Sequence, residues 1–304
     1  MVMSDNMRGA LFMMLSMAGF TISDSLMKQL TVDLPLSQVI LLRGIVTTAL
    51  TLGLAWRMGA LRMALPRREW GLVFWRLVGE IGAAYFFLTA LKYMPLANMT
   101  AVMQSLPLTV TLAAAVLFRE PVGWRRMGAI LAGLFGVVLI LQPGPEGFNH
   151  YSIYALVAVG FVTLRDLCTR RLSRETPSLL VTVITAVAVT GVFGVVSIGV
   201  EWQPVGGVQS AQLVASGSFV FVGYLCAITA MRSGDIAVVS PFRYTALIWA
   251  LMLGWLVFGD WPSGVTMLGV MIVAGSGLYT LYRERQLRIR TEQLAARSGS
   301  TRGI

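Results

Sequence analysis

Ten apolar segments, each about 20 residues long, divide the chain, and short polar loops separate them. A helix of roughly 20 apolar residues crosses the hydrocarbon core of a bilayer, so each segment predicts one transmembrane helix. No stretch between the segments predicts a soluble domain. The predicted fold class is therefore all-α integral membrane, with ten transmembrane helices. The predicted spans are 8–27, 37–56, 70–91, 97–118, 124–142, 151–170, 178–200, 210–231, 236–258 and 263–282.

The first apolar segment is interpreted as a transmembrane span and not as a signal peptide. Arg8 and the apolar run that follows it have the order of a secretory signal, but no convincing small-x-small cleavage site comes after them. We therefore expect this segment to remain uncleaved as the first of the ten helices.

The composition excludes most soluble chemistry. The 304 residues are 56% hydrophobic and only 12% charged, whereas soluble domains are about 25% charged. One histidine, His150, and two cysteines inside apolar segments cannot form a histidine-rich or thiolate metal site. No G-x-x-x-x-G-K-[ST] motif for ATP is present. We expect no metal, no cofactor and no enzymatic activity.

The net charge of +10 is concentrated in alternate loops. Loops on one side of the predicted membrane, together with the termini, carry eighteen arginines, and the opposite side carries only Lys28 and Lys92. Lys and Arg are enriched in cytoplasmic loops. We therefore predict that both termini are cytoplasmic, and we explain the basic charge by topology and not by a nucleic-acid partner. The arginines are 8, 57, 62, 67, 68, 119, 125, 126, 170, 171, 174, 232, 283, 285, 288, 290, 297 and 302.

The two halves of the chain show a weak internal repeat. Four residues recur 142 positions later, and the glycine pair of the fifth span has a counterpart in the tenth. Each half holds five spans, and because five is odd, the second half must enter the membrane inverted. Inverted repeats are typical of secondary transporters. The predicted division is 1–145, 146–283 and a basic cytoplasmic tail, 284–304. The matches are Asp24, Lys28, Leu30 and Pro35 with Asp166, Arg170, Leu172 and Pro177, and Gly128 and Gly136 with Gly269 and Gly277.

Several segments resemble the drug/metabolite transporter superfamily, in its EamA-type ten-helix branch. Within that branch the chain is similar to bacterial exporters of amino acids, including the YddG-type aromatic amino-acid exporter. The resemblance implies a bacterial inner-membrane protein with a cavity lined by spans one, three, four, six, eight and nine, the fifth and tenth being peripheral. The segments are Ala90-Leu-Lys-Tyr-Met-Pro-Leu-Ala97, Ser105-Leu-Pro107, Phe118-Arg-Glu-Pro121, Arg232-Ser-Gly-Asp235, Ser240-Pro-Phe-Arg-Tyr244 and Phe258-Gly-Asp260.

Seven ionisable residues fall inside predicted spans, where charges usually face the protein interior and pair with one another. Glu80 is a candidate anchor for a substrate amine or a carrier of protons; alternatively it forms a structural ion pair with Arg76 or Arg243. Arg243 either captures a substrate carboxylate, closes the cytoplasmic side, or pairs with Glu80. The remaining candidates belong to gates or ion pairs. They are Asp24, Arg43, Arg76, Arg165 and Asp166.

A pocket for an amino acid needs apolar walls and a few placed polar groups. Aromatic and polar residues of the third, fourth, eighth and ninth spans are candidates for this lining, although packing is the favoured role for any single mid-span aromatic. Pro107 and Pro241 interrupt spans of opposite halves and are candidate kinks or flexing points. The lining candidates, beside Glu80 and Arg243, are Tyr85, Phe86, Met99, Met103, Gln104, Tyr224, Tyr244 and Trp249.

The predicted function is export of small metabolites, in particular amino acids including aromatic ones, by alternating access through a central cavity. The expected partners are a small-molecule substrate and the lipid bilayer; the sequence leaves the oligomeric state open. One alternative is a proton-coupled exporter of cationic drugs, with Glu80 or Asp24 carrying the proton. Another is a membrane-embedded enzyme or lipid-handling protein, which the lone His150 disfavours.

Overall fold

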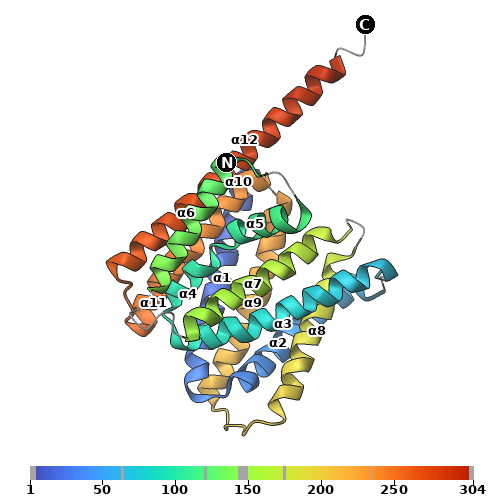
Figure 1. The fold of residues 1–304 in the computed structure, drawn as a ribbon. Coiled ribbons are helices and arrows are strands. Elements are labelled where there is room, and N and C mark those ends of the chain that lie inside the picture. The colour runs from blue at the N-terminus through green and yellow to red at the C-terminus, as the bar shows by residue number, and fades with distance from the viewer. Residues whose placement is uncertain are drawn as a thin grey trace.

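The computed structural model describes residues 5–62, 65–119, 122–142, 150–173, 176–233 and 235–300, and within them the secondary structure is helical throughout (Figure 1). Ten helical segments are long and apolar enough to cross a membrane, which confirms the predicted fold class. The helices are α1 Asp5–Asp33, α2 Leu36–Arg57, η1 Ala60–Arg62, η2 Arg67–Glu69, α3 Trp70–Tyr93, α4 Leu96–Met103, α5 Leu106–Phe118, α6 Trp124–Leu141, α7 His150–Arg171, α8 Ser178–Ser197, α9 Gly207–Ser233, α10 Ile236–Val239, η3 Ser240–Tyr244, α11 Thr245–Phe258 and α12 Gly264–Ser300.

Helix ends follow local sequence signals. Pro35, Pro95 and Pro177 stand immediately before α2, α4 and α8, where a residue without a backbone N–H costs no helical hydrogen bond. Gly259 ends α11 in the left-handed conformation at φ 69°, which glycine adopts without a steric penalty. The largest difference from the predicted spans is α12, which continues as a helix beyond residue 282 to Ser300 and projects from the bundle (Figure 1).

The fourth and ninth spans are each interrupted. The fourth consists of α4 and α5, with Gln104 and Ser105 between them and Pro107 in the first turn of α5. In the ninth, α10 is followed by the 3₁₀ segment η3, which contains Pro241, and then by α11. Both prolines therefore lie where regular α-helical hydrogen bonding is broken, at related places in the two halves.

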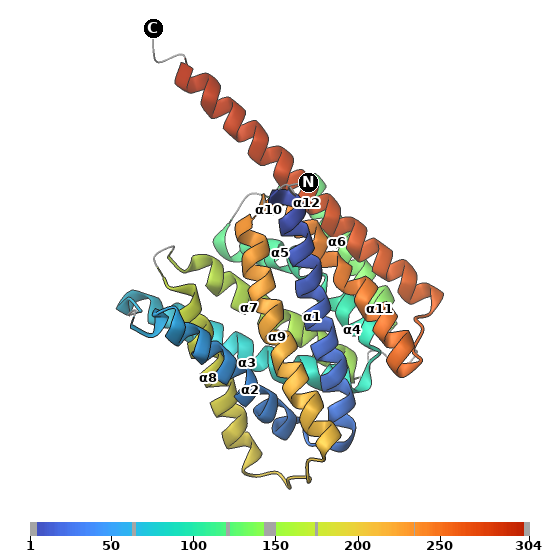
Figure 2. The same ribbon diagram turned by 180° about the vertical axis from the view of Figure 1, so that it is seen from behind.

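Helix pairing has the symmetry of two inverted five-span halves. The most extensive contacts join α1 to α9, α3 to α7, α6 to α12 and α2 to α8 (Figures 1 and 2). The helices α1, α2, α3 and α6 are the first, second, third and fifth spans, and α7, α8, α9 and α12 are their counterparts in the second half. If each of these helices is replaced by its counterpart, the α1–α9 pair becomes the α7–α3 pair, and the α2–α8 and α6–α12 pairs remain the same. A two-fold relation between the halves produces this pattern. The predicted boundary at 145 and 146 lies outside the described residues.

The two ends of the bundle differ in packing. We call the end where α1 begins and α12 leaves the bundle the terminal side, and the opposite end the distal side (Figure 1). The main apolar cluster is built largely from the distal halves of the helices and includes Met27, Ile40, Leu91, Leu96 and Met99, each fully buried. The distal half is therefore closed by close-packed apolar side chains.

Candidate functional site

Two polar cavities lie between the helices. Cavity A, of about 110 Å³, is enclosed by α2, α3, α8 and α9, and its charged lining residues are Arg43, Arg76 and Glu80. Cavity B, of about 160 Å³, is enclosed by the end of α4, by Gln104 and by α5, α7, η3 and α12, and its charged lining residues are Asp166 and Arg243. Intramembrane charges in such cavities are functional candidates because burying them is costly.

Two glycines on α3 bring its backbone against α7. A Cβ atom at Gly79 would lie 2.9 Å from the Arg165 nitrogen and the Phe161 oxygen, and one at Gly82 would lie 2.6 Å from the Phe161 ring. Any larger residue at Gly79 would push the helices apart, since its neighbours there are backbone atoms. The close approach sets Arg165 of α7 beside Glu80 of α3.

Arg165 connects the two cavities. Its Nη1 atom lies 3.5 Å from Glu80 Oε2, and its Nη2 and Nε atoms each lie 2.9 Å from Asp166 Oδ1. Glu80 lines cavity A and Asp166 lines cavity B. The side chain of Arg165 is 25% exposed and that of Glu80 17%. One guanidinium thus holds two partly buried carboxylates that face different cavities.

The sequence-based alternatives for the Glu80 ion pair named the wrong partners. Glu80 pairs with Arg165, and not with Arg76 four residues earlier or with Arg243. Arg76 instead donates from Nε to Thr169 Oγ1 at 3.0 Å and from Nη1 to Thr185 Oγ1. The packing of α3 against α7 determines this partner, because it places Arg165 closer to the Glu80 carboxylate than Arg76 lies on the same helix.

Arg43 and Asp24 lie on neighbouring helices, α2 and α1, and influence one another electrostatically. Among the described residues, no carboxylate oxygen lies within 4 Å of the Arg43 or Arg76 guanidinium. In the described part of the chain, cavity A therefore presents two arginines that form no ion pair within 4 Å.

Threonines are the residues that sequence reasoning missed. Six of them line cavity A, three on α2 and three on α8. Thr48 and Thr190 bond each other across the two helices at 3.0 Å. The threonines of the second and seventh spans could have been noticed as hydroxyls on otherwise apolar helices. Only their convergence on the arginines marks them as a site. The six are Thr47, Thr48, Thr51, Thr182, Thr185 and Thr190.

The structure divides the sequence-based lining candidates between the cavities and the packed interior. Tyr224 lines cavity A, and Met103, Gln104, Arg243 and Tyr244 line cavity B, together with Pro107. Glu80 also lines cavity A, whereas Tyr85, Phe86, Met99 and Trp249 are not among the described residues that line either cavity. Met99 is fully buried in the apolar core.

The aromatic candidates of the third and ninth spans pack against neighbours. Phe86 stacks on Phe161 at 5.5 Å and contacts Tyr85 and Tyr154 edge-on. Trp249 packs against an apolar cluster formed mainly by α1, α9 and η3 with α11. In this conformation these rings therefore join helices and do not line either cavity.

The cavity linings also differ from the set of spans that the resemblance implies. The third and eighth spans contribute to cavity A, and the fourth, sixth and ninth to cavity B, as implied. The second and seventh spans, which the resemblance leaves out, supply most of the wall of cavity A, and the first span lines neither cavity. The tenth span supplies only Leu281, to cavity B.

Comparison with known proteins gives a family and several relatives. The model of the EamA-like transporter family matches residues 7–142 and again 150–282. The riboflavin transporter of Vibrio cholerae is 26% identical over 95% of this chain and 98% of its own length. The S-adenosylmethionine uptake transporter of Rickettsia felis is 24% identical over 66% of this chain and 67% of its own.

Two further comparisons extend over most of the chain. The pseudopaline exporter CntI of Pseudomonas aeruginosa is 24% identical over 87% of this chain and 93% of its own length. A solved crystal structure has a TM-score of 0.64 and 20% identity, and the match covers 91% of this chain and 98% of the other. At that identity the structural match shows the shared fold alone.

Proposed function

This chain belongs to the EamA-like transporter family, and we propose that it moves a small metabolite bearing a carboxylate, of the amino-acid type, through cavity A. It is a multi-pass membrane protein with ten spans, and its relatives are small-molecule transporters of bacteria. The names of these relatives give riboflavin, S-adenosylmethionine and pseudopaline as substrates and give no free amino acid. The amino-acid assignment therefore rests on the chemistry of the cavity.

The observation that carries the proposal is the pair of unneutralised arginines in cavity A. Arg43 and Arg76 face the cavity without an ion-paired carboxylate among the described residues. Arginine binds carboxylates through two parallel N–H donors, and the threonine hydroxyls beside it offer further donors. A substrate carboxylate would neutralise charge that is costly to keep unpaired inside a membrane protein.

Glu80 supplies a place for the substrate ammonium group. Its Oε2 atom contacts Arg165, while Oε1 makes no hydrogen bond to the described residues. A zwitterion with its carboxylate at the arginines would place its ammonium group near Oε1. Specificity for amino acids would come from this opposition of charges within one small cavity.

The cavity favours a small substrate in this conformation. Pockets for drug-sized ligands have volumes of roughly 300–1,000 Å³, whereas cavity A has about 110 Å³. Tyr224 is the only aromatic ring among the described residues that line it. The lining of cavity A therefore gives no support to the preference for aromatic substrates that the resemblance implies.

The closed distal half and the polar cavities fit the state of an alternating-access transporter that is open toward its terminal side. With the predicted topology, the cavities would exchange substrate with the cytoplasm. Export is the direction that the resemblance implies; the relatives' names include both an uptake transporter and an exporter. The cationic-drug alternative is disfavoured because, among the described residues, cavity A carries two arginines without an ion pair, and its carboxylate, Glu80, already contacts Arg165.

Counterflow in proteoliposomes tests the proposal. The panel comprises radiolabelled amino acids of increasing size, one dicarboxylate and one cationic dye, each with and without a pH gradient. We expect flux of small amino acids, with at least tenfold loss in Arg43→Gln and Arg76→Gln, because one lost charged hydrogen bond costs about 1.5–3 kcal/mol.

Arg57→Gln is the control, since Arg57 is exposed at the end of α2 and lines neither cavity. Flux of the dye alone, and only with a pH gradient, would replace the proposal with drug–proton antiport. Flux of the dicarboxylate, with no flux of any amino acid, would contradict the proposed role of Glu80 in binding the substrate ammonium group.

A further inference from the structure

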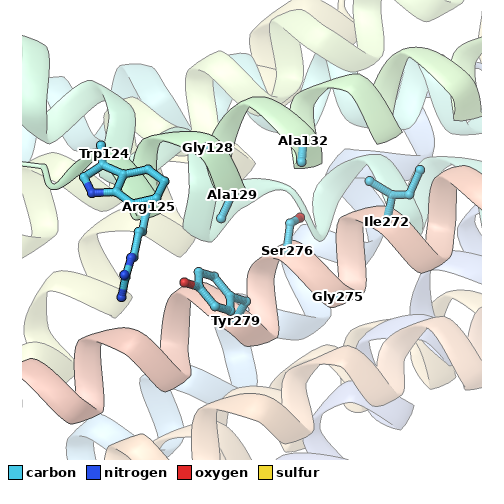
Figure 3. Close-up of a pocket in the computed structure, with 9 residues that line it drawn as sticks. All are labelled: Trp124, Arg125, Gly128, Ala129, Ala132, Ile272, Gly275, Ser276 and Tyr279. Atoms are coloured by element: carbon cyan, nitrogen blue, oxygen red, sulfur yellow. The ribbon is translucent and has the colours of Figure 1, made fainter.

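A groove on the outer surface of the bundle lies between α6 and α12 (Figure 3). It shares none of its lining residues with cavity A or cavity B. Its volume is about 560 Å³. Small residues form its floor, and Trp124, Arg125 and Tyr279 lie together at one end (Figure 3). We propose that this groove binds an anionic phospholipid, with an acyl chain along the floor and the phosphate at Arg125. The other lining residues are Gly128, Ala129, Ala132, Ile272, Gly275 and Ser276.

The groove faces hydrocarbon and not water. Both of its helices qualify as membrane spans, and large apolar side chains on the same helices, among them Leu131, Phe135 and Met271, are about 60% exposed. Exposed apolar surface of this kind on a membrane span contacts lipid. An apolar hollow in such a surface is filled by an acyl chain, because an empty one would forfeit contacts on its lining.

Geometry keeps the hollow open. The two helices lie close together from their middles to their distal ends, where a Cβ at Gly133 would lie 2.5 Å from Ser276 Oγ and one at Gly136 would lie 2.9 Å from the Gly269 oxygen. Toward the terminal side they diverge, and Gly128 and Gly275 have open space where a side chain would be. The small-residue spacing of α6 thus serves helix contact at one end and a groove at the other.

The charge at the groove's mouth selects an anion. Two adjacent arginines point in different directions: Arg126 donates to Thr111 Oγ1 at 3.2 Å, on the neighbouring helix, whereas Arg125 lies over the Trp124 ring at 5.2 Å. Arg125 is exposed and has no ion pair within the described part of the chain. None of the nine lining residues is acidic.

The depth of the groove fits a lipid headgroup. Trp124 is the first residue of α6, and Tyr279 lies one turn before Arg283 on α12. Trp and Tyr favour the level of the headgroups, so this end of the groove lies at the membrane interface. Basic pockets between helices at the cytoplasmic interface are suited to anionic headgroups, and arginine can bind phosphate oxygens through two donors.

A second copy of the chain fits the groove less well. An isologous dimer would oppose the same surface of both copies. Two hollows would then face one another, and the two Arg125 side chains would lie at the same depth. The remaining void and the like charges both oppose such a contact.

Native mass spectrometry of the delipidated full-length protein, titrated with phosphatidylglycerol or phosphatidylcholine, tests the proposal. We expect tighter binding of phosphatidylglycerol, weakened about fivefold in Arg125→Gln, because one arginine near the membrane surface contributes about a fivefold factor. Gly128→Leu fills the groove where there is open space and should weaken binding of the same lipid.

Two matched controls should leave binding unchanged. Arg67→Gln removes an exposed arginine elsewhere, and Gly191→Leu adds a side chain at an exposed glycine of α8 that also has open space. Equal binding of both lipids, or unchanged binding in Arg125→Gln and Gly128→Leu, would overturn the proposal. Efficient disulfide crosslinking of Ala132→Cys between copies in native membranes, without Cys168 and Cys226, would also overturn it in favour of a dimer.

Discussion

At the scale of single residues, Arg165 has the most consequential surroundings. It contacts both Glu80 and Asp166 in the middle of the bundle. Removing one partner of a buried ion pair leaves the other charge uncompensated, which usually destabilises a protein by 3–5 kcal/mol. Because the side chains here keep some exposure, the effect should fall at the low end of that range.

We therefore predict that Arg165→Gln lowers the free energy of unfolding by about 3 kcal/mol. Denaturant titration in detergent measures this loss, and Arg57→Gln, at an exposed position, should change it by less than about 0.5 kcal/mol. Adding Glu80→Gln and Asp166→Asn to Arg165→Gln should recover part of the loss. A loss in the triple variant as large as the sum of the single ones would show that the three groups are not coupled.

Gly79 permits the contact on which the Glu80–Arg165 pair depends. Even a methyl group there would lie 2.9 Å from backbone atoms of α7. We predict that Gly79→Ala costs about 1–3 kcal/mol through overpacking and reduces transport together with stability. Gly71→Ala, on the same helix and with open space around it, should cause no loss. Equal stability of the two variants in thermal unfolding would contradict the prediction.

At the scale of helices, Lys28 joins three elements at the distal side. Its Nζ atom donates to the Leu91 carbonyl at 3.0 Å and to the Met94 carbonyl, and it lies 5.3 Å from the Phe258 ring centroid. These contacts tie α1 to the end of α3 and the end of α11. Conversely, Arg171 of the second half lies over the Phe118 ring of the first at 3.8 Å. A cation of each half therefore lies over the ring that ends the interrupted span of the other half.

We predict that Lys28→Met opens the distal side. The loss of bonds between a charged amine and carbonyls, at about 1.5–3 kcal/mol, should raise the rate at which an impermeant thiol reagent labels Ala90→Cys by about tenfold or more. Ala90 is fully buried in the distal core, and the background lacks Cys168 and Cys226. Lys92→Met is the control, because Lys92 contacts only the ring of Tyr93 in the described structure. Similar labelling in both variants would rule out a closing role for Lys28.

At the scale of the whole molecule, the closed distal half and the two polar cavities imply a transporter open toward its terminal side. Positive charge in the loops predicts that this side is cytoplasmic. We predict that Ala186→Cys, in cavity A, reacts with an impermeant thiol reagent in inside-out vesicles and not in right-side-out ones. Substrate in excess should slow that reaction. Labelling only in right-side-out vesicles would show either that the terminal side is not cytoplasmic or that the transporter is not open toward its terminal side.

The sequence by itself determined the ten helices, the fold class and the family resemblance. Each of these depends on local apolar length, on loop charge or on short motifs, all of which are written along the chain. The inversion of the second half was likewise predicted from the count of five spans in each half.

Tertiary structure decided the partners of the charges. The four-residue spacing of Arg76 and Glu80 favoured a pair on one helix, but two glycines let α7 bring Arg165 closer. The threonines of α2 and α8 became a site only where these helices meet α3 and α9. Such convergence joins residues more than a hundred positions apart, and no periodicity within a single helix encodes it. The groove beside Arg125 arose in the same way, from the open space that α6 and α12 leave at Gly128 and Gly275.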